Sequence, residues 1–350
     1  MIPFTTRFDA TEPLICPLIR CPEPSRFAPS LRRLRQRFAC YAATTPAPLP
    51  APGLVITSEI RHQSELYLPI DEIRRVFYRL YDAALPYSPI YSSSPFHHSR
   101  SWADCFSDLP PWLQQSPSPA DLLEQLLGDY RLLIRFMFHS FLPARFQGAG
   151  FDRYPEQRAW IQAWLRQRAA VGQCNAHLLD AACGSGEGIW ELAEAAAAAG
   201  WRPEQVQLAG WTLEPLEVWA AAHQALPHDP QREQRYRQRV SPLLRHGWAD
   251  RVAFSQRDLL CSSLPGGGFD LIICNGLLGG PLLHRSHDLA LVIANLADLL
   301  LSGGVLLLAD RFHDGWKQKV SPADLATLFA AQGLHPQQCS WGHVVMQYSR

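Results

Sequence analysis

From about residue 174 onward, the sequence alternates between short apolar strands and amphipathic helices. Strands are expected at 176–180, 205–214, 251–260, 269–275 and 304–311, with helices between or after them at 191–200, 215–225, 288–301 and 321–333. This alternation is typical of a parallel sheet covered by helices. The last stretch, 335–349, can form a hairpin that adds antiparallel edge strands. We therefore expect a Rossmann-like, mostly parallel α/β domain over residues 174–350.

The first half of the chain has a different pattern. Residues 54–170 are expected to form a mainly helical domain, because apolar side chains recur at helical spacing in 70–85, 118–142 and 154–170. The Pro-rich, Ser-rich stretch 86–117 is expected to be a loop. Residues 1–53 hold ten of the 29 prolines and are expected to be poorly ordered, with one short basic helix near 30–41. With 350 residues, of which 47% are hydrophobic, the chain is long enough for two domains.

The charge balance excludes several function classes. Lysine and arginine total 32, matching 32 aspartates and glutamates, so a strongly basic nucleic-acid binder is not expected. The two lysines, Lys317 and Lys319, come too late for a P-loop. No apolar run is long enough to span a membrane and no secretory signal is visible, so a cytoplasmic protein with reduced thiols is expected. Cys16 and Cys21 lack a matching second pair, and no metal site is expected.

The strongest local signal is the turn His177-Leu-Leu-Asp-Ala-Ala-Cys-Gly-Ser-Gly-Glu-Gly188. An apolar strand enters a turn of small residues and leaves as a helix. Small residues let a ligand approach the backbone, and the helix N-terminus presents N–H groups to an anion. Ligands of open α/β sheets bind at the carboxyl ends of the strands, where this turn lies. The residues expected to contact a cofactor here are Asp180, Ala182, Cys183, Gly184, Ser185, Gly186 and Glu187.

The spacing and charge of this turn disfavour a dinucleotide. The GxGxxG pattern needs glycine where Ile189 stands. Asp180 and Glu187 would also repel a pyrophosphate, by about 1 kcal/mol or more per close pair. The same carboxylates suit S-adenosylmethionine, which carries an ammonium and a sulfonium. Alternatively, Glu187 only faces the dipole of the helix that it begins.

Three further turns are candidates for the same site. Glu214, at the end of the second strand, can accept both ribose hydroxyls, or it is an ordinary helix N-terminal acid before Pro215. Asp258 can accept the adenine amino group while Leu259 donates its backbone N–H, or Asp258 is a surface acid. Asn275 and Gly276 follow the fourth strand, where a transferring enzyme orients its acceptor. Leu277 and Leu278 either pack on adenine or begin the next helix.

Residues 174–350 resemble a class I S-adenosylmethionine-dependent methyltransferase domain, through the order DAACGSGEG, Glu214, RDLL, FDLIICNG and LSGGVLLLADR. Within that superfamily the chain is similar to the chemotaxis-receptor (CheR-type) glutamate methyltransferases. Those enzymes have a glycine-poor Cys-Ser-Thr-Gly-Glu-Glu turn, a helical N-terminal domain and a Cys-led loop, matched here by Cys274. The resemblance implies that Glu187, Glu214, Asp258 and Asn275 face the cofactor. An Arg-Asn pair and an aromatic residue are replaced here by Asn275-Gly276 and Gly280, and HSFLPAR, with Arg145, stands nearest to the family's Thr-x-Phe-Phe-Arg.

The expected function is therefore methyl transfer from S-adenosylmethionine to an unidentified small molecule or protein carboxylate. Two alternatives are a CheR-type protein-glutamate O-methyltransferase and a non-catalytic S-adenosylmethionine-binding regulatory protein. An NAD-linked enzyme is disfavoured by Ile189 and Glu187. Asn275 and His284 are weak candidates for catalytic residues, and His139 and Asp310 are other candidate bases, which are needed only if the acceptor carries a proton.

Overall fold

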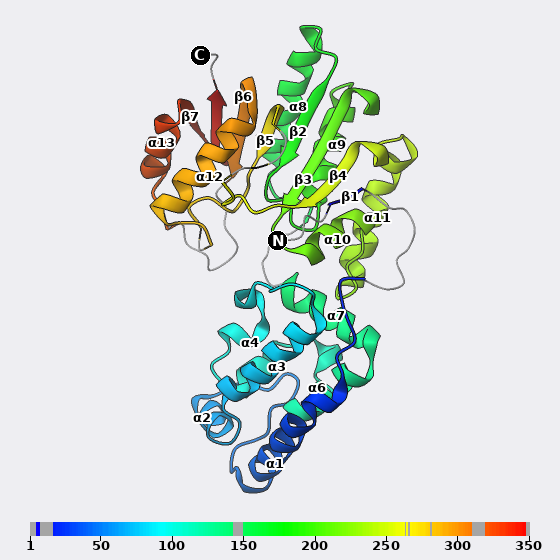
Figure 1. The fold of residues 1–350 in the computed structure, drawn as a ribbon, viewed down its shortest axis with the longest axis vertical. Helices are drawn as coiled ribbons and strands as arrows, with labels where there is room; N and C mark the ends of the chain where they lie inside the picture. The colour runs from blue at the N-terminus through cyan, green and yellow to red at the C-terminus, as the bar shows by residue number, and fades with distance from the viewer. Residues whose placement is uncertain are drawn as a thin grey trace. The chain divides into compact units, whose positions relative to one another are not determined.

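The structure is a computed structural model that describes residues 5–7, 17–142, 150–262, 264, 267–280, 282–309 and 319–347. The chain divides into two compact units, Leu14–Pro143 and Met1–Pro13 with Ala144–Arg350 (Figure 1). We call them the helical unit and the α/β unit.

All regular elements in the described part of the helical unit are helices. The α-helices are α1 (Ala28–Thr44), α2 (Ser58–Tyr67), α3 (Ile70–Ala84), α4 (Pro95–His98), α5 (Trp102–Asp108), α6 (Pro119–Gly128) and α7 (Tyr130–Phe141). Three short 3-10 helices accompany them: η1 (Pro24–Phe27), η2 (Tyr91–Ser93) and η3 (Pro111–Leu113). The core is rich in aromatic rings, and Phe77 stacks on Phe96 with ring centroids 4.2 Å apart. The Tyr81 hydroxyl lies 3.0 Å from both Ser94 Oγ and Ser140 Oγ, so this buried polar group is satisfied.

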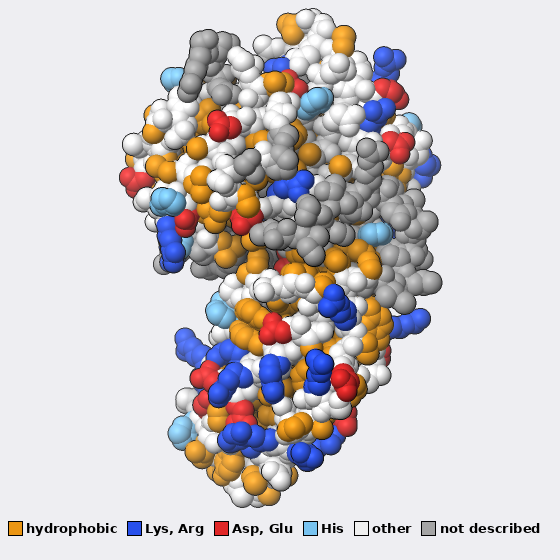
Figure 2. Space-filling model, viewed as in Figure 1, with side chains coloured by type: hydrophobic (Ala, Val, Ile, Leu, Met, Phe, Trp, Pro, Cys, Tyr) orange, Lys and Arg blue, Asp and Glu red, His pale blue; other side chains and the backbone are white. Residues whose placement is uncertain are grey.

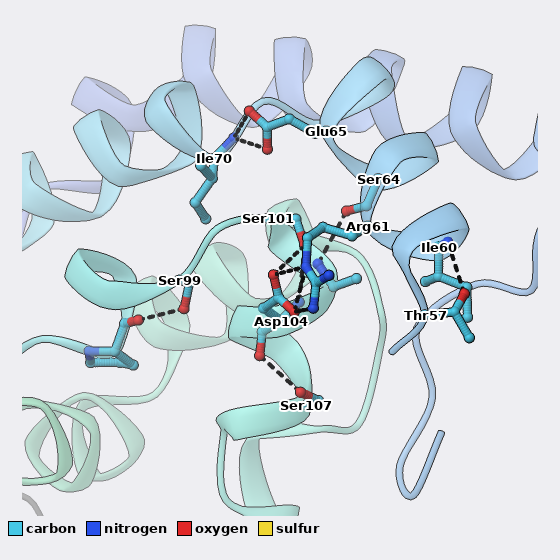
Figure 3. A network of polar contacts seen from close by, with 12 residues as sticks. Thr57, Ile60, Arg61, Ser64, Glu65, Ile70, Ser99, Ser101, Asp104 and Ser107 are labelled. Atoms are coloured by element: carbon cyan, nitrogen blue, oxygen red, sulfur yellow. Dashed lines mark hydrogen bonds and ion pairs between the residues drawn. The ribbon is translucent and has the colours of Figure 1, made fainter. Parts of the chain in front are cut away.

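A polar network joins α2 to α5 (Figure 3). The Arg61 guanidinium donates to Asp104 in a two-pronged pair, with Nε–Oδ2 and Nη2–Oδ1 both 2.9 Å. Ser101 caps α5 by accepting from the Asp104 N–H, and Ser64 accepts from the Ala103 N–H at 3.1 Å. The start of α5 is therefore fixed by side chains from its own cap and from α2.

Three sequence expectations for this unit are wrong. The first is poor order in residues 1–53, which is wrong for 17–53: residues 28–44 form α1, with Pro29 in its first turn, and α1 buries Leu34 and Tyr41 on one face. The basic helix expected within that segment is confirmed, and its Arg33 and Arg37 pair with Glu72 of α3.

The second is the loop over 86–117, which contains α5 because Ser101 caps a helix whose Trp102 and Phe106 enter the core. The third is one long helix over 118–142. The structure breaks it at Gly128, where Asp129 accepts from the Arg131 and Leu132 N–H groups and begins α7.

The α/β unit is built on one sheet, which has eight strands in the described part of the chain. They are β1 (Thr5–Arg7), β2 (Ala176–Asp180), β3 (Val206–Thr212), β4 (Val252–Gln256), β5 (Phe269–Ile273), β6 (Leu300–Ala309), β7 (Leu334–Cys339) and β8 (Gly342–Gln347). Their order is β1-β4-β3-β2-β5-β6-β8-β7. The five central strands are parallel, while β1, β7 and β8 pair antiparallel. The mostly parallel sheet and its C-terminal hairpin are confirmed; β1 is an addition that the sequence did not reveal.

Helices accompany the strands as the alternation predicts. They are α8 (Pro155–Ala170), α9 (Glu187–Ala198), α10 (Pro215–His223), α11 (Pro230–Arg245), α12 (Ser286–Leu299) and α13 (Pro322–Ala331), with 3-10 helices η4 (Pro203–Gln205) and η5 (Ala249–Arg251). Helices α12 and α13 share one apolar cluster with strand residues such as Leu179, Ile272 and Leu306. Helix α9 packs on β2 and β3 and contacts α8 and α11. The expected helix over 288–301 extends two residues too far, because α12 ends at Leu299 and β6 follows without a loop.

Helix α8 belongs to the α/β unit, and the expected boundary that placed 154–170 in the helical domain is wrong. The Leu165 carbonyl accepts from Trp201 Nε1 at 3.0 Å. Arg168 Nη2 pairs with the buried Asp270 at 2.7 Å, and Asp270 also accepts from the His177 N–H. These contacts fasten α8 to the amino ends of β2 and β5.

The surface carries no dominant charge on the face drawn in Figure 2. There, Lys/Arg and Asp/Glu side chains lie interspersed over the helical unit. Within the ranges given above, every helix is too short or too polar to cross a membrane.

Candidate functional site

The strand order places a candidate site at the carboxyl edge of the sheet. From β2 the chain moves outward to β3 and β4, and then returns to β5 on the other side of β2. The order therefore reverses between β2 and β5, and open α/β sheets bind ligands outside the carboxyl ends at such a reversal. The turns after β2, β3, β4 and β5 share this edge, and they contain the residues singled out from the sequence.

The turn after β2 requires glycine. Gly184 and Gly186 have φ angles of +52° and +92°, which side chains rarely adopt. A Cβ on Gly186 would lie 2.7 Å from Ala221 Cβ, and one on Gly188 would lie 2.6 Å from Asp180 Oδ2. The turn is thus packed against α10 on one side and against the Asp180 carboxyl on the other. Helix α9 begins directly after it.

Two acids lie beside this turn. Asp180 is buried, and its Oδ1 accepts from the Ala182 N–H at 3.1 Å. Burial raises the pKa of Asp180 to about 7. Burial also raises the pKa of Glu217 to about 7, although its hydrogen bond with the Thr212 hydroxyl acts in the other direction. A charged ligand bound next to these two carboxyl groups would therefore change the protonation state of both.

Glu187 is held inside the protein by Arg232. The carboxylate is buried; its Oε1 accepts from Arg232 Nε at 2.8 Å and its Oε2 from Ser185 Oγ at 2.7 Å. Arg232 Nη2 also donates to Ser185 Oγ, and the Tyr236 hydroxyl donates to the Ser185 carbonyl at 3.0 Å. From the sequence we expected the negative charge of Glu187 to attract a cationic cofactor. In the structure Arg232 already compensates that charge.

Glu214 lies where the sequence placed it, immediately beyond β3, and it is buried. Its Oε1 accepts from the Leu216 N–H at 3.4 Å, so it is the N-cap of α10. This contact is the expected helix-terminal role, and Glu214 also lies at the strand end where the ribose role was expected. Beside it, the last residue of β3 presents the Thr212 hydroxyl, which is hydrogen-bonded to Glu217.

Asp258 and Leu259 form a tight turn beyond β4. Asp258 Oδ1 accepts from the Leu260 N–H at 2.9 Å, and the Asp258 carbonyl accepts from the Cys261 N–H. The Leu259 side chain is buried in the cluster with α12. Asp258 is only partly buried, at the same edge as the glycine turn.

Asn275 uses its amide within the protein. It forms a reciprocal pair with the buried Gln157 of α8, at 2.7 and 3.0 Å, and its Oδ1 also accepts from the Ala309 N–H at 2.9 Å. The Gly276 N–H donates to the Ala309 carbonyl, and Gly276 has a φ of +67°. The turn after β5 is therefore fixed to β6 and α8. Leu278 is buried in the α12 cluster and precedes that helix.

The remaining candidates belong to other segments of the chain or lie outside the described residues. His284 is exposed before α12, and His139 is on α7 of the helical unit, with its ring 6.0 Å from that of Trp112. Asp310, Arg145 and Cys16 lie outside the described residues. Burial raises the pKa of both Cys183 and Cys274, which favours their thiol forms. In the described part of the chain, no group of three or more His, Cys, Asp or Glu side chains is arranged to hold a metal ion.

Sequence reasoning missed the side chains that fix these turns: Gln157, Glu217, Arg232, Tyr236 and Asn295. Arg232 and Tyr236 are four residues apart and therefore share one helix face, which was a visible signal. Nothing in the spacing of Gln157 or Asn295 marks them, because their partners are distant in sequence.

Comparisons with known proteins show similarity to solved structures only. No family model matches the chain, and no curated protein does. Among solved structures it is similar to a TehB-like SAM-dependent methyltransferase from Corynebacterium glutamicum, at 17% identity over 56% of this chain and 100% of that chain, with a TM-score of 0.34.

It is also similar to an amino pentose methyltransferase from Micromonospora echinaspora, at 17% identity over 55% of this chain and 91% of that chain, with a TM-score of 0.36. The magnesium protoporphyrin IX methyltransferase of Synechocystis is 16% identical over 62% of this chain and 99% of that chain, with a TM-score of 0.37.

Proposed function

We propose that this protein is an S-adenosylmethionine-dependent methyltransferase. The observation that carries the proposal is the reversal of strand order between β2 and β5, with the glycine turn at the end of β2 and acid-bearing turns at the ends of β3 and β4. In such a sheet the four turns face one ligand, and the groups that they carry match an adenosine bearing a cationic tail.

The charges at the turn favour a cationic ligand over a dinucleotide. Asp180 and Glu217 gain a favourable partner when a sulfonium or ammonium binds nearby, and that partner shifts both toward their carboxylate forms. A pyrophosphate would instead be repelled by the carboxylate forms of Asp180 and Glu217. Arg232 does not change this preference, because its charge is already matched by Glu187.

We assign each part of the cofactor to one of these turns. Backbone groups of residues 182–186 and the Asp180 carboxyl would hold the methionine part, Glu214 the ribose hydroxyls, and Asp258 with the Leu259 N–H the adenine. When bound, S-adenosylmethionine supplies an electrophilic methyl group. The protein's own contribution is then alignment of the acceptor with that methyl group. Gly276, next to the fixed amide of Asn275, belongs to the turn that we assign to the acceptor side.

Calorimetry with S-adenosylmethionine, S-adenosylhomocysteine and NAD tests the cofactor. We expect micromolar binding of the first two, corresponding to about −8 kcal/mol, and no binding of NAD. NAD binding without S-adenosylmethionine binding would overturn the proposal.

Two substitutions separate the roles of Glu214. Glu214→Ser removes the carboxylate and keeps a good N-cap residue, whereas Glu214→Ala removes both. We expect both variants to lose about tenfold or more in affinity for S-adenosylhomocysteine, and only the alanine variant to lose about 1 kcal/mol of stability. Unchanged affinity in the serine variant would remove Glu214 from the ribose site.

The acceptor can be a small molecule or a protein carboxylate. The resemblance to CheR-type enzymes supports a glutamate side chain, and a labelled methyl ester that releases methanol in mild base would distinguish this acceptor from others. If the protein binds the cofactor tightly but transfers no label in cell extract, the non-catalytic alternative is favoured.

A further inference from the structure

Helix α12 carries one buried amide in an otherwise apolar face. Asn295 is nine-tenths buried, next to Leu296 in the cluster that α12 shares with the sheet. Its Nδ2 donates to the Leu259 carbonyl at 2.7 Å and to the Cys261 carbonyl at 2.8 Å. Both amide protons are therefore used on a single turn. A buried amide is costly unless it is hydrogen-bonded, so these two contacts account for its place there.

The turn that Asn295 holds is the one that follows β4. It is fixed from inside by the Asp258 carboxylate, which accepts from the Leu260 N–H, and by the Cys261 N–H, which donates to the Asp258 carbonyl. The buried Leu259 side chain is a third contact that holds the turn. Asn295 adds a fourth, because its amide donates to the carbonyls of Leu259 and Cys261 and holds them toward α12. The Asp258 carboxylate and the Leu259 N–H are thereby set in one fixed orientation.

We infer that Asn295 is a positioning residue that sets the purine specificity of this site: by fixing the Asp258–Cys261 turn, it makes the site select a 6-amino purine over a 6-oxo purine. The inference rests on the proposed function, because it assigns this turn to the base of the cofactor. Asn295 does not touch the ligand in this account and acts through Asp258 and Leu259.

The selectivity follows from hydrogen-bond polarity. Adenine presents a donor at its 6-amino group and an acceptor at N1, which match a carboxylate and a backbone N–H. Hypoxanthine presents an acceptor and a donor at the same two places, so both contacts become mismatched. A site with both groups fixed should prefer adenine by about 100-fold, whereas a turn that can rotate its peptide groups should prefer it much less.

The test is a ratio of affinities, measured by calorimetry with S-adenosylhomocysteine and S-inosylhomocysteine. The variants are Asn295→Asp, which replaces the two donors by a carboxylate, and Asn295→Ser, which keeps one donor on a shorter side chain. Asp270→Asn is the matched control: Asp270 is also buried and holds backbone by hydrogen bonds, but at the amino edge of the sheet. Melting temperatures of all variants measure the purely structural cost.

We expect the wild type to prefer the adenosyl compound by about 100-fold, the aspartate variant by less than about tenfold, and the serine variant by an intermediate factor. The control should melt at a lower temperature and keep the wild-type ratio. If the aspartate variant does not fold, the serine variant decides.

The inference is overturned if the wild type binds both compounds equally, or if the Asn295 variants weaken both affinities by the same factor. A wild type that binds neither compound contradicts the proposed function itself, which is a separate outcome.

Discussion

At the scale of single residues, Asp180 combines burial with close contact to the glycine turn. It receives one backbone hydrogen bond, from Ala182, and its pKa is raised to about 7 by burial. In the unfolded chain the pKa of the same carboxyl lies near its ordinary value of 3.8. Between these two values the folded state holds a proton that the unfolded state has released. Stability therefore falls as pH rises through this window, and the loss is complete above about pH 7.

The substitution Asp180→Asn removes this titration and keeps an oxygen that can accept from Ala182. We expect the variant to gain stability relative to the wild type between pH 4.5 and pH 8, by roughly 3 kcal/mol. Urea unfolding at both pH values measures this gain. The exposed Asp250→Asn is the control and should show no such difference. A constant difference between the Asp180 variant and the wild type at all pH values would contradict this assignment.

The glycine turn was visible in the sequence because strand, small residues and helix follow one another directly. The partners of that turn were not visible. Arg232 lies 45 residues from Glu187, and Asn295 lies 36 residues from Leu259. Only the folded topology brings such pairs together. For this reason the glycine turn could be predicted from local order, whereas the charge compensation of Glu187 could not.

At the scale of elements, α11 does more than cover the surface. Its sequence is rich in arginine, as is common for a surface helix. One of its faces, however, buries Tyr236 and Val240 and directs Arg232 to the glycine turn. Some helix boundaries could not be predicted from the sequence for a local reason. A single capping residue such as Asp129 separates two helices within one continuous apolar pattern.

Arg232→Met should destabilise the protein by about 3–5 kcal/mol, because it leaves the Glu187 carboxylate buried without its cation. The control is Arg239→Met on the same helix, whose pairs with Asp152 and Glu194 are more exposed and should contribute about 1 kcal/mol. Chemical denaturation measures both. The double variant Glu187→Gln/Arg232→Met should recover part of the loss, since no unpaired charge remains. Equal losses for the two arginines would contradict this account of Glu187.

At the scale of the whole molecule, the chain has two compact units with separate cores. The helical unit is organised around rings such as Phe77, Tyr81 and Phe136, and the α/β unit around the sheet. Cooperative unfolding commonly follows such divisions.

Phe136→Ala should therefore remove about 3–5 kcal/mol from the helical unit. We expect hydrogen exchange to accelerate mainly in residues 17–142, with β2, β5 and β6 keeping their protection. Mass spectrometry of exchanged peptides reports both regions in one experiment. Uniform acceleration along the whole chain would instead indicate a single cooperative unit.

The terminal hairpin has a consequence for assembly of the sheet. Although β8 follows β7 in sequence, it lies between β6 and β7 and pairs with both. A chain in which β8 has not yet joined the sheet therefore leaves one edge of β6 unpaired, and an unpaired edge can recruit strands of other chains. Insertion of β8 closes that edge and docks β7 in the same step.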